Sequence, residues 1–127
     1  MNLVAAVIGL ALVEYFVFSL LVGRARAQYG VAAPATTGHP IFERYMRVHQ
    51  NTLEQLVVFV PAMLLFGTYV SSRFAALLGL VWIGGRVLYL RGYVDDPAKR
   101  STGFALTVLP QLILLLGGIV GALLARS

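Results

Sequence analysis

Four long hydrophobic stretches, separated by short polar segments, organise the chain. They cover residues 3–22, 55–72, 74–94 and 101–125. At about 1.5 Å per residue, a helix of about 20 residues crosses about 30 Å, the thickness of the hydrocarbon core of a bilayer. The first stretch contains one charged residue, Glu14, and the last contains none. The pattern predicts an all-α integral membrane protein with a bundle of four transmembrane helices.

Turn-forming residues indicate where these helices begin and end. Residues 28–40 are rich in glycine and proline, which predicts a loop. Pro40 fits the first turn of a helix, so the second helix is expected to begin about 12 residues before its apolar part and to protrude from the bilayer. Only residues 71–73 join the second and third stretches, which predicts an antiparallel hairpin. Asp96 before Pro97 is typical of a helix start. The expected helices cover about residues 3–27, 41–71, 74–95 and 97–125 of a single membrane domain, residues 1–127.

The composition agrees with a membrane environment. Of the residues, 59% are hydrophobic and 12% are charged, whereas a typical soluble domain has about 25% charged residues. Lipid is therefore the expected solvent for much of the chain, and a disordered or fibrous chain is excluded. The chain has no cysteine, so any thiol chemistry must come from a ligand, and no metal site is expected. No basic tail or aromatic-rich basic patch indicates a nucleic-acid partner.

The basic residues are distributed unevenly between the two ends of the expected bundle. The chain has ten Lys plus Arg and five Asp plus Glu, a net charge of +5. Two basic residues, Arg73 and Arg126, map to one end, and the other eight map to the opposite end. These eight are Arg24, Arg26, Arg44, Arg47, Arg86, Arg91, Lys99 and Arg100. Because cytoplasmic segments carry the excess of Lys and Arg, this second end is expected to be cytoplasmic and both termini outside.

Polar residues on the second helix form a stripe. Each helical residue advances by about 100°, so Arg47, Asn51 and Glu54 lie within about 60° of one another, while His49 points to the opposite side. The stripe has two open interpretations, a brace between helices or a binding face. If His49 faces a neighbouring chain, it is a candidate donor or base.

A second polar face lies on the third helix, where Arg86, Tyr89 and Tyr93 point in similar directions. Ionisable residues at the centre of a bilayer cost roughly 2.5 to 3.5 kcal/mol each, so their clustering favours a shared water-filled cavity. The competing interpretation is that arginines set topology and tyrosines anchor the chain at the interface. Glu14, midway along the first helix, either pairs with a polar group of another helix or has a functional role.

These residues also resemble a known family. Residues 47–54 read Arg-Val-His-Gln-Asn-Thr-Leu-Glu, similar to the Arg-x-His-x-Asn-x-x-Glu motif of the MAPEG family, the membrane-associated proteins of eicosanoid and glutathione metabolism. The likeness extends through residues 36–38, 86–93 and 96–101. Residues 49–54 and the Pro-x-Lys-Arg-Ser turn most resemble the microsomal glutathione transferase 3 branch, with leukotriene C4 synthase more distant.

The resemblance implies a homotrimer that binds glutathione as co-substrate between adjacent protomers at the cytoplasmic side. Arg100 matches the arginine that activates the thiol, and the hydroxyl of Tyr93 is expected near the sulfur. The other expected glutathione-binding residues are Arg47, Asn51, Glu54, Tyr89 and Arg91, with Arg26 and His49 from the neighbouring protomer. Gln55 and Ala27 replace a tyrosine and a second arginine of leukotriene C4 synthase, which argues against leukotriene C4 synthesis.

The expected function is therefore a membrane-bound glutathione transferase that attacks lipophilic electrophiles, with glutathione-dependent peroxidase activity left open. The absence of an endoplasmic-reticulum retention tail favours a bacterial inner membrane. One alternative is a small four-helix proton-coupled drug transporter that uses Glu14, although the charge asymmetry argues against the dual topology of some such proteins. Another is a non-catalytic lipid-binding member of the same superfamily, which the presence of Arg100 makes less favoured.

Overall fold

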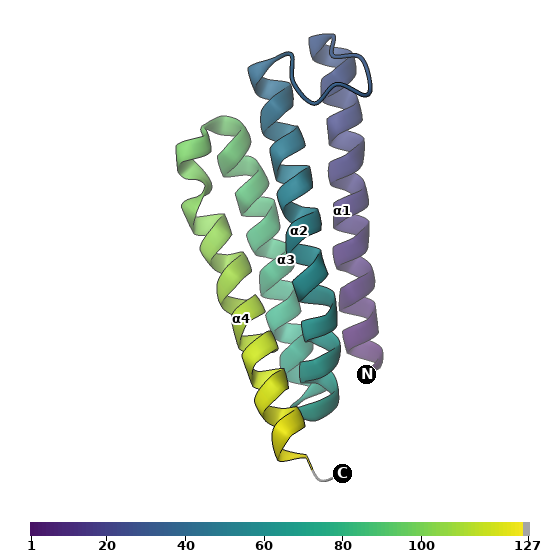
Figure 1. Cartoon of the computed structure of the whole chain (residues 1–127), viewed down its shortest axis with the longest axis vertical. Helices are drawn as coiled ribbons and strands as arrows, with labels where there is room; N and C mark the ends of the chain where they lie inside the picture. The colour runs from purple at the N-terminus through teal and green to yellow at the C-terminus, as the bar shows by residue number, and fades with distance from the viewer. Residues whose placement is uncertain (126–127) are drawn as a thin grey trace.

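Four long helices run side by side along the molecule (Figure 1). The structure is a computed structural model that describes residues 1–125, so Arg126, expected at the weakly charged end, lies outside the described residues. The helices are α1 (Asn2–Tyr29), α2 (Pro40–Tyr69), α3 (Ser72–Asp95) and α4 (Ser101–Leu124), with a short 3-10 helix η1 (Pro97–Arg100) before α4. All four long helices are long and apolar enough to cross a membrane, which confirms the expected all-helical class. Helices α2 and α3 each pack against both α1 and α4.

The helix ends follow from local residue chemistry. Gly30 adopts a left-handed conformation with φ 68° and closes α1, a conformation that glycine adopts without steric cost. This cap lets α1 continue two residues beyond the expected end at residue 27. Pro40 occupies the first turn of α2, where a backbone N–H would have no partner within the helix, so the lack of an N–H in proline costs no hydrogen bond. His39 caps this end, because its Nδ1 accepts from the backbone N–H of Ile41 at 3.1 Å.

The start of the fourth helix differs from the expectation. Asp96 accepts from the backbone N–H of Ala98 at 3.1 Å, as an N-cap acid should. The backbone N–H of Lys99, however, donates to the Asp96 carbonyl at 2.7 Å, which is the tighter i to i+3 pattern of a 3-10 turn. The α-helix therefore begins at Ser101, four residues later than the pattern indicates. Arg100 consequently sits at the N-cap of α4, not within its first turn.

Aromatic packing fills the centre of the bundle. The rings of Phe59 and Trp82 stack with centroids 4.1 Å apart. Both side chains are fully buried, together with Met63 and Leu114, so the core joins α2, α3 and α4. Many large apolar side chains on the outer surface stay exposed, such as Val57 at 68%. In water such a surface would be unfavourable, whereas lipid tails solvate it.

Two glycines allow α3 and α4 to approach closely. A Cβ built on Gly85 would lie 2.8 Å from the carbonyl carbon of Leu106. A Cβ built on Gly103 would collide with the backbone nitrogen of Tyr89. Only a residue without a side chain fits at these positions. The close approach places Tyr89 directly against the first turn of α4.

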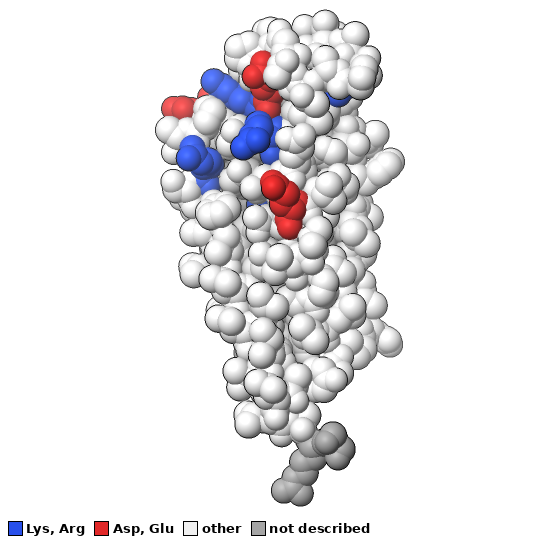
Figure 2. Space-filling model, viewed as in Figure 1, with Lys and Arg blue, Asp and Glu red and all other residues white. Residues whose placement is uncertain are grey.

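Most of the basic residues gather at one end of the bundle, whereas Arg73, at the start of α3, lies at the other end. The end of α1, the start of α2, the end of α3 and η1 all lie at this end (Figure 1). On the visible face the charged side chains cluster there, and the rest of that face shows none (Figure 2). Arg44 fastens two of these segments, because its Nη1 donates to the carbonyls of Val94 at 2.9 Å and Asp95 at 3.1 Å. We call this region the basic end.

Candidate functional site

A cavity of about 500 Å³ opens at the basic end between α2, α3 and the start of α4. Three of the residues expected from the sequence line it, namely Asn51, Tyr89 and Arg100. The remaining lining residues are Ser101, Phe104 and Ala105, all from the first turns of α4. Sequence reasoning missed these three, although Phe104 lies one helical turn after Arg100. The cavity therefore combines a cation, an amide and a phenol with an apolar wall.

Arg86 is completely buried beneath this cavity. Its Nη2 donates to the Asn51 side-chain oxygen at 2.8 Å and to the Thr52 hydroxyl at 2.9 Å, and its Nη1 donates to the Thr107 hydroxyl at 3.5 Å. Its guanidinium carbon also lies 4.3 Å from the centre of the Tyr89 ring, within range of a cation–π interaction. One side chain thus joins α2, α3 and α4 directly below the cavity.

The two tyrosines on α3 lie next to each other. Tyr89 is 5% exposed, and its ring centroid is 5.6 Å from that of the half-buried Tyr93. The positive charges of Arg86, Arg100 and Arg47 all act on the Tyr89 phenol. The expected shared face of α3 is therefore present, with the Arg86 guanidinium over the Tyr89 ring and Tyr93 beside it.

The side chains of Arg47, Glu54 and Arg100 are exposed. Arg100 donates from Nη1 to the carbonyl of Pro97 at 2.7 Å, within its own turn. Within residues 1–125 the only ion pair joins Lys99 and Asp95, at 2.7 Å. No carboxylate of the described chain therefore neutralises Arg47 or Arg100, which leaves both free to bind an anion.

Arg26 lies away from the cavity. It projects from the end of α1, where its Nη1 donates to the carbonyl of Ala35 at 2.7 Å and its guanidinium lies 4.8 Å from the ring centre of Phe42. It lines a separate open hollow at the end of α1. Arg91 is exposed, and the helical period places it on the side of α3 opposite Tyr89. Within one chain, neither arginine joins the cavity.

His49 lies between α1 and α2. Its ring stacks on Tyr15 with centroids 4.6 Å apart. Both ring nitrogens are buried and have no hydrogen-bond partner in the part of the chain that the structure describes. The side of α2 that carries His49, predicted to point away from Arg47 and Asn51, thus faces α1 of the same chain.

Glu14 is the one buried carboxylate on α1, at 9% exposed. Neither carboxylate oxygen has a hydrogen-bond partner among residues 1–125. Arg86 is the cation whose charge acts on it, but no direct ion pair between the two forms in this region. The interhelical hydrogen bond or ion pair expected for Glu14 is therefore not formed among residues 1–125.

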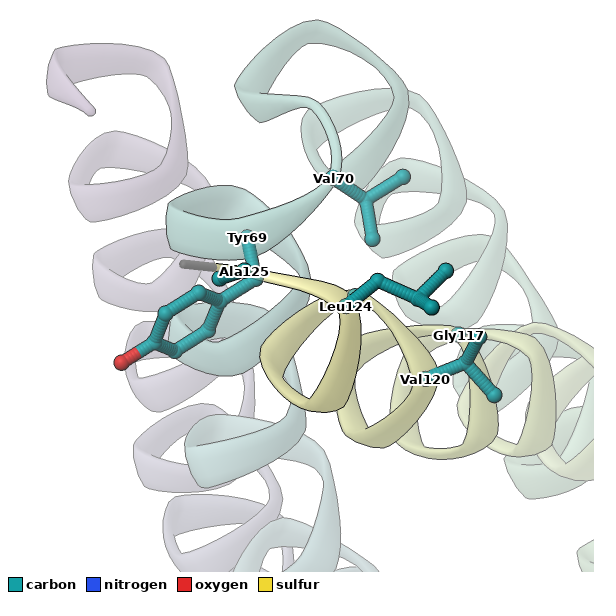
Figure 3. A pocket seen from close by; sticks show the side chains of 7 residues that line it. Tyr69, Val70, Gly117, Val120, Leu124 and Ala125 are labelled. Carbon is teal, nitrogen blue, oxygen red and sulfur yellow. The ribbon is translucent and has the colours of Figure 1, made fainter. Parts of the chain in front are cut away.

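A second cavity, of about 570 Å³, lies at the other end of the bundle (Figure 3). Its lining comes from the ends of α2 and α4: Tyr69, Val70, Gly117, Val120, Gly121, Leu124 and Ala125. None of these side chains is charged, so this cavity offers apolar contact and one phenol. Across residues 1–125, no group of three or more His, Asp or Glu residues is placed to hold a metal ion. The chemistry therefore concentrates at the basic end.

Comparison with known proteins identifies the family of this bundle. The family model described as MAPEG family matches residues 4–120. The chain belongs to the MAPEG family. The MAPEG chain is 49% identical over 119 residues to an uncharacterized protein of Synechocystis sp., covering 94% of this chain and 87% of that protein. It is 43% identical over 118 residues to microsomal glutathione S-transferase 2 of Homo sapiens, covering 92% and 80% respectively.

A third relative is leukotriene C4 synthase of Cavia porcellus, 40% identical over 93 residues, which cover 73% of this chain and 61% of that protein. The expected family is confirmed, and the four apolar helices make this MAPEG chain a multi-pass membrane protein. The motifs favoured the type 3 branch of the microsomal glutathione transferases, whereas the human relative is named type 2.

Replacing Arg86 with methionine tests its role as the link between three helices. The Arg86→Met variant leaves Asn51, Thr52 and Thr107 without their buried donor, so we expect the free energy of unfolding to fall by roughly 2–4 kcal/mol. Thermal unfolding in detergent, followed by circular dichroism, measures this loss. Arg91→Met is the matched control on the exposed side of α3 and should change stability by less than about 0.5 kcal/mol. Equal effects of the two substitutions would contradict the proposed role.

Proposed function

We propose that this MAPEG protein is a membrane glutathione transferase, in which Arg100 stabilises the glutathione thiolate for attack on a lipophilic electrophile. The observation that carries the proposal is the cavity lined by Asn51, Tyr89 and Arg100 at the basic end. Relatives named microsomal glutathione S-transferase 2 support glutathione conjugation as the general activity. The chain has no cysteine, so glutathione must supply the sulfur.

The energetic requirement on Arg100 is modest. A free thiol has a pKa of about 8.5, and lowering that pKa by two units requires about 2.7 kcal/mol of preferential anion stabilisation. One cation at about 4 Å supplies roughly 4 kcal/mol at an effective dielectric constant of 20, before desolvation is subtracted. Arg100 is unpaired by any carboxylate of the described residues, and it sits at the N-cap of α4. The positive end of the helix dipole adds to its charge.

The remaining charged groups fit the other ends of glutathione. Its two carboxylates match the planar guanidinium groups of arginines, which bind a carboxylate through two hydrogen bonds. The candidates are Arg47, Arg91 and, from the neighbouring protomer, Arg26. Its ammonium group matches the exposed carboxylate of Glu54. The apolar co-substrate enters from the bilayer along the wall formed by Phe104. A lipid hydroperoxide that reaches the same thiolate would be reduced to the alcohol as its terminal oxygen passes to the sulfur, and a second glutathione would convert the resulting sulfenic acid to the disulfide with loss of water, which gives the site a peroxidase side activity.

The assembly that completes this site is a homotrimer. Arg26 lies outside the cavity of its own chain, so it reaches glutathione only if a neighbouring protomer presents it. The ring of His49 packs on Tyr15 with both nitrogens buried, so it must first turn away from α1 to reach a neighbouring site. The basic end faces the cytoplasm in this arrangement, with both termini outside, and we place the protein in a bacterial inner membrane. The transporter alternative rests on Glu14 alone, and the lipid-binding alternative gives no role to an unpaired Arg100.

Glutathione conjugation of an aryl halide by the purified protein in detergent tests the proposed activity. The Arg100→Ala variant should lose the ultraviolet absorbance of the bound thiolate and about 100-fold in kcat/KM, because removing one preorganised charge from a transition state has effects of this size. Lys99→Ala removes the neighbouring cation, which is already paired with Asp95, and should retain both signals. An undiminished thiolate absorbance in Arg100→Ala would refute the role assigned to Arg100.

Mixed assemblies test whether two protomers share each site. Arg26→Ala and Arg100→Ala chains should each be impaired alone, but co-expression creates interfaces that combine an intact Arg26 with an intact Arg100. Random mixing in a symmetric ring restores about a quarter of the sites. Conjugation assays on co-purified mixed assemblies measure the recovery, and separately purified variants combined without exchange are the control. Activity no higher than that of the two variants alone would rule out a shared site.

Tyr93 tests the contribution of a hydroxyl near the sulfur. Tyr93→Phe removes one hydrogen-bonding group and keeps the ring that packs against Tyr89, so we expect kcat to fall about three- to tenfold with little change in the KM for glutathione. Tyr69→Phe at the opposite end is the matched control and should behave as the unmodified protein (Figure 3). Unchanged steady-state kinetics in Tyr93→Phe would remove Tyr93 from the catalytic set.

A further inference from the structure

A chain of hydrogen bonds crosses the middle of the bundle from α3 through α4 to α2. The indole N–H of Trp82 donates to the side-chain oxygen of Gln111 at 3.0 Å. The amide nitrogen of Gln111 in turn donates to the side-chain oxygen of Gln55 at 2.9 Å. Trp82 and Gln111 are buried, whereas Gln55 is only half-buried. The chain of bonds therefore begins in the core and ends at the surface between α2 and α4.

The chemistry of Trp82 determines which group donates in each of these hydrogen bonds. An indole N–H donates and never accepts, so Gln111 must turn its oxygen toward Trp82. Its NH2 group then faces Gln55, which must accept through its own oxygen. The amide orientations of glutamines are normally ambiguous, but a donor-only group at the buried end removes the ambiguity. Gln55 is left with an NH2 group that has no partner among residues 1–125.

The same arrangement recurs one helical turn away. Arg86 is also donor-only, and its Nη2 donates to the oxygen of Asn51, so the Asn51 NH2 group is free at the cavity. Trp82 and Arg86 are separated by four residues on α3, as Asn51 and Gln55 are on α2, so each pair occupies consecutive turns. Arg86 directly, and Trp82 through Gln111, thus orient the carboxamides of α2 so that their oxygen atoms accept within the bundle and their NH2 groups stay free. Asn51 and Gln55 form a strip on α2 in which both side-chain oxygens already accept a hydrogen bond and both NH2 groups are free to donate, which we call the donor strip.

We propose that the Gln55 NH2 group binds an oxygen atom of the lipophilic co-substrate, and that Trp82 and Gln111 are positioning residues that hold this group in place. The inference rests on the proposed transferase function. Gln55 lies one turn, about 5.4 Å, farther from the basic end than Asn51, at a depth that an apolar molecule from the bilayer reaches more readily than a charged tripeptide. An N–H group unpaired in hydrocarbon is costly, so an acceptor oxygen on the bound molecule is its favourable partner.

An α,β-unsaturated ketone has the acceptor that this geometry requires. The thiolate forms a carbon–sulfur bond at the β-carbon, the π electron pair moves toward the carbonyl oxygen, and the resulting enolate takes a proton from water. Negative charge therefore develops on the oxygen that Gln55 contacts, and its hydrogen bond strengthens in the transition state. Benzyl chloride is the matched co-substrate without oxygen, since the thiolate displaces chloride at a carbon with no neighbouring acceptor.

The Gln55→Met variant keeps the length of the side chain and removes its donor. We expect kcat/KM for benzylideneacetone, an α,β-unsaturated ketone, to fall about tenfold, the value of one good hydrogen bond. The kcat/KM for benzyl chloride and the KM for glutathione should each stay within about twofold. Equal losses on both co-substrates, or no loss on either, would overturn the assignment of Gln55.

A double-mutant cycle separates positioning by Trp82 from general stability. Trp82→Phe removes the N–H and keeps a ring to stack on Phe59, so Gln111 and Gln55 are no longer held in one orientation. We expect a loss of about three- to fivefold for the ketone alone, and no further loss when Trp82→Phe is added to Gln55→Met. A loss that persists in the Gln55→Met background, or that extends to benzyl chloride, would contradict positioning.

Assays of the unmodified protein distinguish a failure of the transferase function from a failure of the role assigned to Gln55. Conjugation of benzyl chloride by the unmodified protein supports the transferase function independently of Gln55. If both co-substrates react and Gln55→Met does not discriminate between them, the donor strip is refuted and the transferase function stands. If neither reacts, the proposed function is refuted, and the inference about Gln55 is refuted with it.

Discussion

The rest of the site depends on a single buried guanidinium. Arg86 has no exposed surface, and its hydrogen bonds reach α2 and α4 from α3. A buried cation is tolerated only where acceptors surround it, so the helices must present oxygen atoms at this depth. Asn51 and Thr52 do so from α2, and Thr107 does so from α4. These bonds engage Nη1 and Nη2 of Arg86, while its buried Nε has no partner among residues 1–125, and they hold the three helices in one relative rotation beside the cavity.

The molecule separates two kinds of polar group by depth. The exposed cations at the basic end, such as Arg47 and Arg100, are free to meet a charged ligand in water. The buried donors, Arg86 and Trp82, instead orient the side-chain amides of Asn51 and Gln111. Glycine contacts such as Gly103 against Tyr89 bring α3 and α4 close together beside the cavity that Asn51, Tyr89 and Arg100 line. In the proposed function, a charged thiol compound reaches this cavity from water and an apolar molecule reaches it from lipid.

Much of this fold was predictable because its signals are local. Long apolar stretches and proline positions, such as Pro40, predict helices without knowledge of tertiary contacts. The position of Arg86 and Tyr89 on one face of α3 also follows from helical spacing alone. The 3-10 turn before Ser101 was not predicted, because Asp96 and Pro97 favour a helical start without distinguishing a 3-10 turn from an α-helix. The depth of a side chain within the bundle has no signal in a single sequence.

The sequence by itself determined the four spans, the end that carries the positive charge and the family motif, since each depends on residue type and spacing along the chain. Only the tertiary structure decided which polar groups meet. It placed Asn51, Tyr89 and Arg100 at one cavity and kept His49 outside it against α1. It also decided that Gln55 is left with a free donor, because hydrogen-bond direction depends on which side chain of another helix lies opposite. That choice is made by helix rotation and packing distance, which no local pattern encodes.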